Sequence, residues 1–418
     1  MFKKILLTIL ILSLFALGVY WFFFRKSSPN PVVNTDGTTG NPSFTPINRN
    51  PLGNNNSQTP DTGSFSTSTE ENTTNEVYKV PKLRKLSSTP VSGFTASTTA
   101  SSSLVRFMDR ATGHIYEADD FSQAISRISN TTLPKIYESY WNRNSNQAVL
   151  RYLKDDSDII TNFYAELRYN ASTSEVEPYE IKGKFLSPDI KEVAVSPGGS
   201  QIFTWNIESG KGIGYISNFD ESKKTKITDI PLTKVNIDWP ENNTVTLTTK
   251  GSAASSGFMY AVDTRTGIAK KIIGSNTRGL SAKSSSDMSK VLYSALSGTR
   301  LNTYLLDTKN NISEETVFRT LADKCVWSKL RKNEVYCAVP TEIPSALYPD
   351  DWYKGNVSFV DQIWYLDTET GEVHLMANLL KLSNELIDAT ELTLDNKDNF
   401  LYFMNKRDLS LWALDLNQ

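Results

Sequence analysis

Cysteine and histidine are nearly missing from this chain, which has two of each among its 418 residues. The two cysteines, Cys325 and Cys337, are too few for a disulfide-based scaffold. The two histidines, His114 and His374, leave little room for a histidine-based metal site. We therefore expect no metal and no cofactor.

Several functional classes find no support in the residues present. The chain contains neither a Gly-x-Ser-x-Gly nor a His-Glu-x-x-His segment, so neither a serine hydrolase nor a zincin is indicated. Its formal net charge is -2 at pH 7, and it contains no block of five like charges. Because nucleic-acid-binding domains usually carry a basic excess, we expect no nucleic-acid partner.

One long apolar run stands near the N-terminus. Residues 5–24 carry no charge, and twenty such positions are needed to cross about 30 Å of hydrocarbon. Tyr20 and Trp21 lie near one end, where interfacial aromatic residues are common. A cleaved signal peptide is the alternative, but it needs a shorter apolar core and a small-x-small site. This run ends in Trp-Phe-Phe-Phe-Arg-Lys, so residues 1–26 are predicted to be an uncleaved membrane anchor.

Residues 27–79 are rich in Thr, Asn, Ser, Pro and Gly, and their apolar residues are scattered. Such a segment buries too little surface to offset its chain entropy, so we predict a disordered linker. Lys3 and Lys4 before the span nearly balance Arg25 and Lys26 after it, which leaves the orientation open. The linker composition and a bridgeable cysteine pair favour an extracytoplasmic domain, in the periplasm or at the cell surface.

Residues 80–418 repeat one short phrase, made of an apolar pair, an aspartate and a polar or glycine turn. The aspartates are Asp263, Asp307, Asp367 and, in a degenerate copy, Asp415, with steps of 44, 60 and 48 residues between them. Apolar and polar residues alternate between the turns, as they do in β-strands. Short strands repeating every 40 to 50 residues or so indicate an all-β fold, the β-propeller.

The two ends of the repeat array complement each other. Residues 82–87 read as a lone outermost strand, whereas the last repeat supplies three strands near 391–394, 400–403 and 411–414. We therefore predict that the N-terminal strand completes the last blade and closes the ring, which removes open sheet edges. This closure gives a seven-bladed β-propeller, or a six-bladed one if residues 89–130 do not form a full blade.

One turn carries a family resemblance. The segment Val195-Ser-Pro-Gly-Gly-Ser-Gln-Ile-Phe203 resembles the Ser-Pro-Asp-Gly turn of the WD40-like repeats in TolB-type β-propellers, with Gly198 where that family usually has Asp. The resemblance covers residues 80–418 at the level of repeat architecture. The whole arrangement is similar to uncharacterised, membrane-anchored bacterial envelope proteins. Propellers of this kind mostly bind proteins or glycans and some are enzymes, so the resemblance implies the fold more than the function.

The two cysteines lie in two neighbouring strands of one repeat. If Ser328 pairs with Glu334, the register places Cys325 opposite Cys337, close to disulfide geometry. A structural disulfide is therefore predicted, with two buried thiols as the alternative. A slip of one residue would put the two cysteines on opposite faces of the sheet.

The connection formed by residues 340–360 is the candidate binding site, because it is about fifteen residues longer than its counterparts. Long ordered loops in compact domains tend to be functional, and Trp and Tyr beside charges are typical of recognition sites. The alternative is a loop that folds back over a blade with Trp352 buried. The candidate residues are Tyr348, Asp350, Asp351, Trp352, Tyr353 and Lys354.

The sequence therefore predicts a membrane-anchored extracytoplasmic propeller that acts as a binding or scaffolding module for a protein or glycan of the cell envelope. Residues 5–24 would contact the membrane. The alternative is an envelope glycan hydrolase or lyase with carboxylates at the propeller channel, which needs acid and base groups close together. Asp350 and Asp351 are poor candidates for such a pair, because adjacent side chains rarely converge on one substrate.

Overall fold

The computed structural model describes residues 80–98, 103–119, 124–154, 159–170, 177–274 and 276–418. All of these residues fall within one compact unit. The predicted membrane anchor and linker lie outside the described residues. Within the part that is described, no helix combines the length and the apolarity that a membrane span requires.

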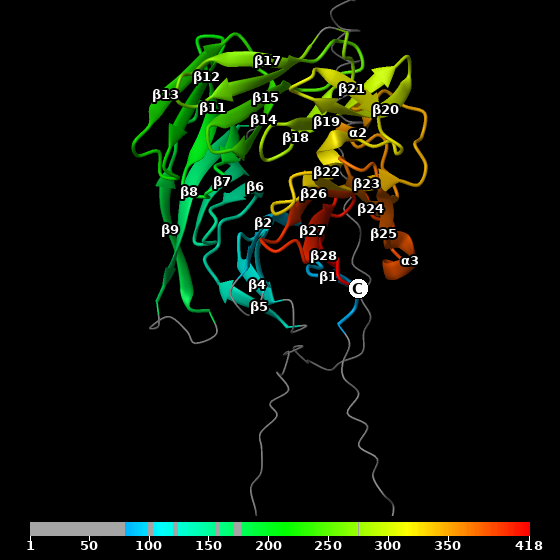
Figure 1. Cartoon of the computed structure of the whole chain (residues 1–418). Helices are drawn as coiled ribbons and strands as arrows, with labels where there is room; N and C mark the ends of the chain where they lie inside the picture. The colour runs from blue at the N-terminus through cyan, green and yellow to red at the C-terminus, as the bar shows by residue number, and fades with distance from the viewer. Residues whose placement is uncertain (1–79, 99–102, 120–123, 155–158, 171–176, 275) are drawn as a thin grey trace, which may run out of the picture. The chain divides into compact units, whose positions relative to one another are not determined.

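The described residues form an all-β propeller whose 28 strands belong to six hydrogen-bonded sheets (Figure 1). Four sheets contain four strands consecutive in sequence. Their strands are β10 (Ile190–Val195), β11 (Ile202–Glu208), β12 (Lys211–Ser217), β13 (Thr225–Ile230); β14 (Val235–Glu241), β15 (Thr244–Thr249), β16 (Met259–Asp263), β17 (Ala269–Ile273); β18 (Ser281–Ser284), β19 (Lys290–Ser297), β20 (Arg300–Asp307), β21 (Ile312–Glu315); and β22 (Cys325–Trp327), β23 (Glu334–Pro340), β24 (Asp361–Asp367), β25 (Val373–Asn378).

The fifth sheet joins the two ends of the propeller, and the sixth has eight strands. The fifth contains β26 (Ala389–Leu394), β27 (Phe400–Asn405), β28 (Leu411–Asp415) and β1 (Leu83–Lys85). The sixth contains β2 (Val91–Thr98), β3 (Ser103–Asp109), β4 (Ile115–Asp119), β5 (Ile125–Ser129), β6 (Ile136–Trp141), β7 (Gln147–Leu153), β8 (Ile160–Tyr169) and β9 (Tyr179–Phe185). The helical segments are η1 (Ala322–Lys324), α2 (Asp350–Tyr353) and α3 (Leu379–Ser383).

The eight-stranded sheet decides how blades are counted. Its halves, β2–β5 and β6–β9, are each a four-stranded antiparallel meander. A single parallel pairing, Ser129 with Tyr179, joins the outermost strands of the two halves. The sheets therefore number six and not the predicted seven, because this one pairing merges two repeats.

The predicted closure of the ring is present in the fifth sheet. Strand β1 runs antiparallel to β28, with Leu83 opposite Leu414 and Lys85 opposite Trp412. The Leu86 amide extends the ladder by donating to the carbonyl of Leu411, 2.7 Å away. In Figure 1 the blue β1 lies beside the red β28, so the first and last described strands share one sheet.

Large aromatic residues fill the space between neighbouring blades. The rings of Phe203 on β11 and Trp239 on β14 meet edge to face, with centroids 6.3 Å apart. Trp327, at the end of β22, donates its indole N–H to the carbonyl of Lys283 on β18 at 3.1 Å. Trp327 ends the first strand of its blade, and Trp239 lies near the end of another first strand. First strands of neighbouring blades contact one another, as β10 does with β14 and β22 with β26. Side chains that project inward from these strands therefore come from different blades.

The repeated aspartate is a turn-forming residue. Oδ1 of Asp263 accepts hydrogen bonds from the amides two and three residues further on, both at 2.9 Å. Asp307 and Asp367 repeat this arrangement at 2.7 to 3.0 Å. Such turns satisfy backbone N–H groups that the strands leave free. The hydrogen bond from the Thr266 amide, with those from Arg265, lowers the pKa of Asp263 to about 2.

The cysteines occupy the predicted register. Cys325 on β22 lies opposite Cys337 on β23, and Val326 lies opposite Tyr336. A disulfide joins the two cysteines, whose Cα atoms are 4.1 Å apart. Both are buried in a cluster with Leu292. The bridge therefore links the first two strands of a blade and lies against the neighbouring blade.

Candidate functional site

The long connection between β23 and β24, residues 341–360, is a folded unit that we name the strap loop. It starts and ends at one point, since the Thr341 amide donates to the Val360 carbonyl at 2.9 Å. The short helix α2 stands in its middle. Asp350 at the start of α2 accepts hydrogen bonds from the Ala253 amide at 2.6 Å and the Ser252 hydroxyl at 3.3 Å. Because those two residues join β15 to β16, the loop reaches a blade that is not its immediate neighbour.

Two of the predicted binding residues lie inside the strap loop and not on its surface. Tyr348 and Trp352 are 2% and 3% exposed. They form a small apolar cluster with Phe359 from the same loop and with Leu301 and Leu321 from the preceding blade and its connection. For these two side chains the structure matches the alternative in which Trp352 is buried, because the loop needs a core of its own.

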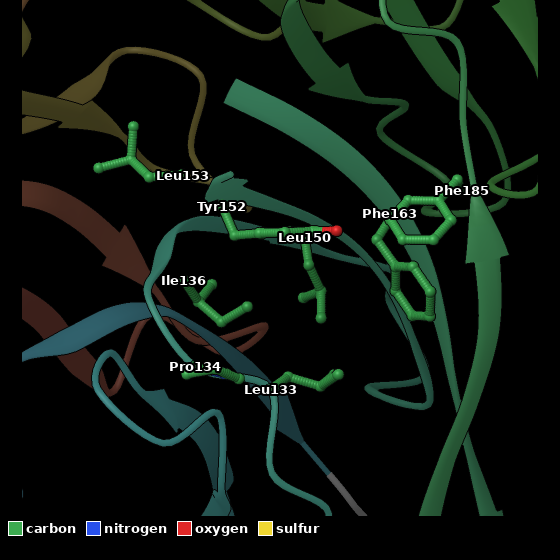
Figure 2. Close-up of a pocket in the computed structure, with 8 residues that line it drawn as sticks. All are labelled: Leu133, Pro134, Ile136, Leu150, Tyr152, Leu153, Phe163 and Phe185. Carbon is green, nitrogen blue, oxygen red and sulfur yellow. The ribbon is translucent and has the colours of Figure 1, made fainter. Parts of the chain in front are cut away.

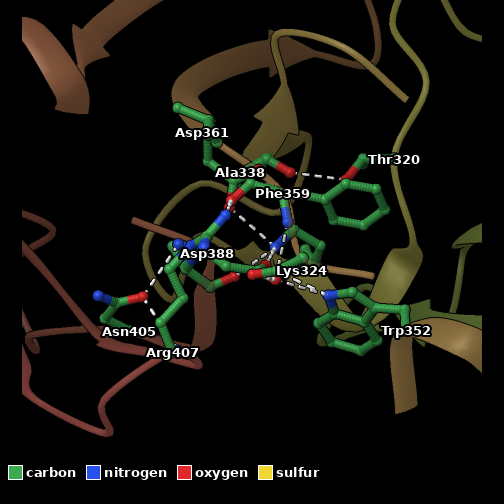
Figure 3. Close-up of polar contacts among 12 residues, drawn as sticks. Thr320, Lys324, Ala338, Trp352, Phe359, Asp361, Asp388, Asn405 and Arg407 are labelled. Carbon is green, nitrogen blue, oxygen red and sulfur yellow. Dashed lines mark hydrogen bonds and ion pairs between the residues drawn. The ribbon is translucent and has the colours of Figure 1, made fainter. Parts of the chain in front are cut away.

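Lys324 lies under the strap loop and is fully buried together with two carboxylates. Its ammonium nitrogen contacts Asp361 Oδ2 at 2.8 Å, Asp388 Oδ1, and the Ala389 carbonyl at 2.8 Å. Lys324, Asp361 and Asp388 come from η1, β24 and the segment before β26, and we name them the buried triad (Figure 3). Burial of a lysine side chain is costly unless the side chain is paired and hydrogen-bonded, as Lys324 is here.

Asp388, directly before β26, fastens the strap loop to the start of the next blade. Its carboxylate accepts hydrogen bonds from the Trp352 indole and the Phe359 amide, both at 3.0 Å (Figure 3). It also accepts a hydrogen bond from the Ser358 hydroxyl at 3.0 Å. Burial pushes the pKa of Asp388 upward, but the Lys324 ammonium and these donors hold it below its ordinary value. The Asp388 side chain is therefore an ionised anchor and is not available to a ligand.

The pKa of Asp361 is shifted in the opposite direction to that of Asp388. Burial raises its pKa to about 6, against the pull of Lys324 and with a contribution from the negative Asp388. Its Oδ2 accepts from the Ala389 amide at 2.7 Å, while its Oδ1 is buried without a partner among the described residues. Two carboxylates share one ammonium here, so the less well hydrogen-bonded one holds its proton more tightly.

The predicted residues Asp351 and Lys354 have different roles. Asp351 accepts hydrogen bonds from the Leu347 amide at 2.8 Å and from the Asn356 side chain at 3.0 Å, which closes the turn around α2. Asp350 and Asp351 therefore bind different segments and do not form a catalytic pair. Lys354 follows α2 and is exposed.

Tyr353 connects the strap loop to the inner strands. Its side chain is 39% exposed, and its hydroxyl donates to Oδ2 of Asp323 in η1, directly before the inner strand β22. Burial and the Asp323 carboxylate together raise the pKa of Tyr353 well above its ordinary value, so the phenol keeps its proton. Tyr353 is the predicted site residue that lies beside other charged groups of the ring interior.

The sequence did not predict a second set of charged residues, which lies on or next to the inner strands. We name it the inner-strand cluster: Glu138 (β6), Asp238 (β14), Lys283 (β18), Asp323 (η1) and Glu391 (β26). Lys283 contacts Asp238 at 3.4 Å, and the two side chains are 36% and 38% exposed. Glu138 is paired with Arg151 at 2.6 Å. The sequence signal that could have revealed it is an acidic residue shortly before the tryptophan of a first strand, at Glu138 before Trp141 and at Asp238 before Trp239.

The charges of this cluster act on one another across blades. Burial raises the pKa of Glu391, Lys283 opposes this, and the negative Glu138 and Asp323 add to it. Burial likewise raises the pKa of Asp323. Asp238 raises the pKa of Lys283. Charges contributed by different blades therefore act on one another, and the pKa values of the Asp323 and Glu391 carboxyl groups are raised.

Glu391 also has an unusual backbone. Its φ is +55°, in the left-handed region, at the point where the register between β26 and β27 shifts. Such bulges redirect side chains and are common beside functional sites. The Glu391 carboxylate forms no hydrogen bond with any residue that the structure describes, so it is available to a ligand.

A separate hollow of about 240 Å³ lies in the β6–β9 half of the double sheet and is almost entirely apolar. Figure 2 shows Phe163 and Phe185 on one side of it and Leu133, Pro134 and Ile136 on the other. It offers no charged group for chemistry. Elsewhere too, the described residues contain no group of three or more His, Cys, Asp or Glu side chains arranged to hold a metal ion.

Comparisons with known proteins agree with the fold and go no further. No family model and no curated protein matches this sequence. Among solved structures, the chain is similar to an oligogalacturonate lyase in complex with manganese, at 10% identity and a TM-score of 0.46, over 80% of this chain and 98% of that one. It is also similar to TolB from Acinetobacter baumannii, at 14% identity and a TM-score of 0.39, over 77% and 78% of the two chains.

A third similar structure is the β-propeller domain of the Trilobed protease from Pyrococcus furiosus. The identity is 11% and the TM-score 0.45, over 78% of this chain and 95% of that one. The resemblance to TolB-type propellers drawn from the sequence is thus confirmed as a structural similarity. One fold can serve many functions, so the function has to be argued from the residues of the site.

Proposed function

We propose that this chain is a membrane-anchored, extracytoplasmic, seven-bladed β-propeller that binds a protein or glycan of the cell envelope. The apolar run at residues 5–24 and the polar segment at residues 27–79 support the anchor and its spacer. Counting the two halves of the eight-stranded sheet as two blades supports the number seven, because each half is a complete four-stranded meander.

The binding site in this proposal is the inner-strand cluster together with Tyr353. The observation that carries it is the hydrogen bond from Tyr353 to Asp323, which brings the strap loop to a set of partly exposed charged side chains. Specificity in rigid folds usually resides in loops of this kind. The carboxylates of Asp323 and Glu391 would accept hydrogen bonds from ligand hydroxyl or amine groups, and the phenol ring would pack against the ligand.

The test is capture of the partner in cells by crosslinking and mass spectrometry, with point variants of the full-length protein. We expect Tyr353→Ala and Glu391→Gln to lose the partner that the unchanged protein captures, and Lys309→Gln, an exposed substitution in a distant turn, to keep it. Replacing the whole loop is a poorer test, since Trp352 and Phe359 contribute to folding. Equal capture by all variants would refute this location of the site.

The raised pKa of Glu391 favours a second candidate, an envelope glycan hydrolase or lyase. A carboxyl group with a raised pKa is suited to general-acid catalysis, and the carboxylates of Glu138 and Asp323 act electrostatically on Glu391. In this case the purified protein would cleave an envelope glycan, and Glu391→Gln would abolish cleavage while leaving the glycan bound. Capture without turnover would favour the binding module.

A further inference from the structure

A polar hollow of about 560 Å³ lies where the first half of the strap loop faces the β18–β21 blade. Its walls are residues 299–301 at the start of β20, residues 317–319 before η1, and residues 339–346 with Tyr348. Ligand pockets usually measure roughly 300–1,000 Å³, so this hollow is large enough for a short peptide segment or a small molecule. We name it the arginine groove.

Two guanidinium groups give the groove its charge. Arg319 forms no hydrogen bond or ion pair with any described residue. Arg300 has its nearest carboxylate, that of Glu315, at 3.9 Å, and both of those side chains are largely exposed. Among the described lining residues Glu342 alone is acidic. Arginine binds carboxylates in a planar, two-pronged geometry, so two weakly paired arginines favour an anionic ligand.

The groove is held in shape before any ligand arrives. Thr320, next to Arg319, is buried; its amide donates to the Thr303 hydroxyl at 2.8 Å and its own hydroxyl donates to the Ala338 carbonyl at 2.6 Å. On the opposite wall, the Tyr348 hydroxyl donates to the Pro344 carbonyl at 2.7 Å. A preformed site loses less conformational freedom on binding, which increases its affinity.

The other lining residues indicate the kind of ligand. Both aromatic side chains of the groove, Phe318 and Tyr348, are buried, so neither presents a ring face on which a sugar could stack. Val317 is 78% exposed and Ile343 is half-buried, so the groove also offers aliphatic surface beside its arginines. Carboxylates next to aliphatic side chains are a feature of polypeptides.

We propose that the arginine groove binds an extended acidic peptide segment of a partner protein. Two carboxylate side chains of the peptide pair with Arg300 and Arg319, and an aliphatic side chain between them packs against Val317 and Ile343. The negative charge of Glu342 repels the carboxylates of the peptide and so weakens its binding. This site is separate from the inner-strand cluster, and its existence does not depend on the function proposed there.

The experiment measures fluorescence anisotropy of labelled peptides with the full-length protein in detergent micelles. The probes are Gly-Asp-Val-Asp-Gly and its uncharged counterpart Gly-Asn-Val-Asn-Gly. We expect only the acidic probe to bind, and Arg300→Gln with Arg319→Gln to weaken it tenfold or more, since a hydrogen bond to a charged group is worth about a factor of ten. Glu342→Gln should strengthen binding, and Lys354→Gln on the same loop should leave it unchanged.

The same measurements can overturn the proposal. Equal binding of both peptides, binding that survives loss of both arginines, or no binding of the acidic peptide would each refute it. Displacement of the acidic probe by a uronate oligosaccharide at lower concentration than by unlabelled acidic peptide would assign the groove to a glycan instead. Thermal unfolding of each variant shows that the exposed substitutions leave the fold intact. Variants of Glu391 leave this binding unchanged, so failure at one site is distinguishable from failure at the other.

Discussion

The buried triad and the inner-strand cluster contain the same kinds of groups in different surroundings. Each places a lysine among carboxylates contributed by more than one blade. Lys324, Asp361 and Asp388 are sealed from water, whereas Lys283 and Asp238 keep more than a third of their side-chain surface exposed. In the first set, the Asp388 carboxylate accepts hydrogen bonds from protein donors that fasten the strap loop. The second leaves carboxylate oxygens unused, and this difference separates a structural ion group from a candidate binding site.

The largest effect is expected from removing the lysine of each set. Lys324→Met should destabilise the protein by about 3–5 kcal/mol, because it leaves two buried carboxylates without their cation. Lys283→Met, the matched substitution in the open cluster, should cost less than about 1 kcal/mol, since water replaces the lost partner. Urea unfolding of both variants measures the difference, and similar losses would contradict the contrast.

A second comparison uses pH. Because the pKa of Asp361 is raised to about 6 in the folded state, the folded protein binds a proton more tightly than the unfolded chain does. The stability from this proton is fully present below the unfolded pKa of Asp361 and is lost as the pH rises through about 6, by about 3 kcal/mol. We expect Asp361→Asn to flatten this part of the stability profile. An unchanged profile in unfolding experiments between pH 4 and pH 7 would contradict the assignment.

A smaller effect should follow from removing one donor to the triad. Trp352→Phe keeps the ring in the apolar cluster of the strap loop but loses the indole N–H that donates to Asp388. The loss should be about 1–3 kcal/mol, the usual result of leaving a buried acceptor with fewer partners. Tyr348→Phe is the control in the same cluster, since the Tyr348 hydroxyl contacts only a loop carbonyl. Thermal melting that ranks the two variants in reverse would argue against Asp388 as the anchor.

The smallest effect on stability is expected at Glu391. Glu391→Gln should change the free energy of unfolding by less than about 0.5 kcal/mol, because the Glu391 carboxylate forms no hydrogen bond with a described residue that the substitution could remove, yet it should abolish partner capture. A large stability loss without loss of capture would instead give Glu391 a structural role, like that of the buried triad.

The sequence predicts the structural features that repeat along the chain, but it does not predict the contacts that form only when different blades come together. The aspartate turns at Asp263, Asp307 and Asp367 are local, so their spacing was enough to predict short strands and a propeller. The cysteine register was also local, because a single short turn sets it. Pairing of Lys324 with Asp388 joins residues 64 positions apart and requires two blades to be already in place.

The candidate site was predictable only in part, for a related reason. The length of the strap loop could be read from the sequence, but the direction of its side chains depends on the blades that it crosses. Trp352 and Tyr353 are neighbours, yet one is buried and the other faces the inner strands. Glu391 was missed because a bulge in β26 redirects its side chain, and no repeat signature marks a bulge of this kind.

The pairing of β1 with β28 makes closure of the ring depend on synthesis order. Residues 83–85 leave the ribosome more than three hundred residues before their partners at 412–414. During that interval β1 has no sheet to join, and the other blades can stack only as an open arc. A chain broken off before Leu411 would keep the edge of β27 uncovered, which offers a template for aggregation and a target for proteases. Only chains translated beyond that point can therefore close the ring and cover this edge.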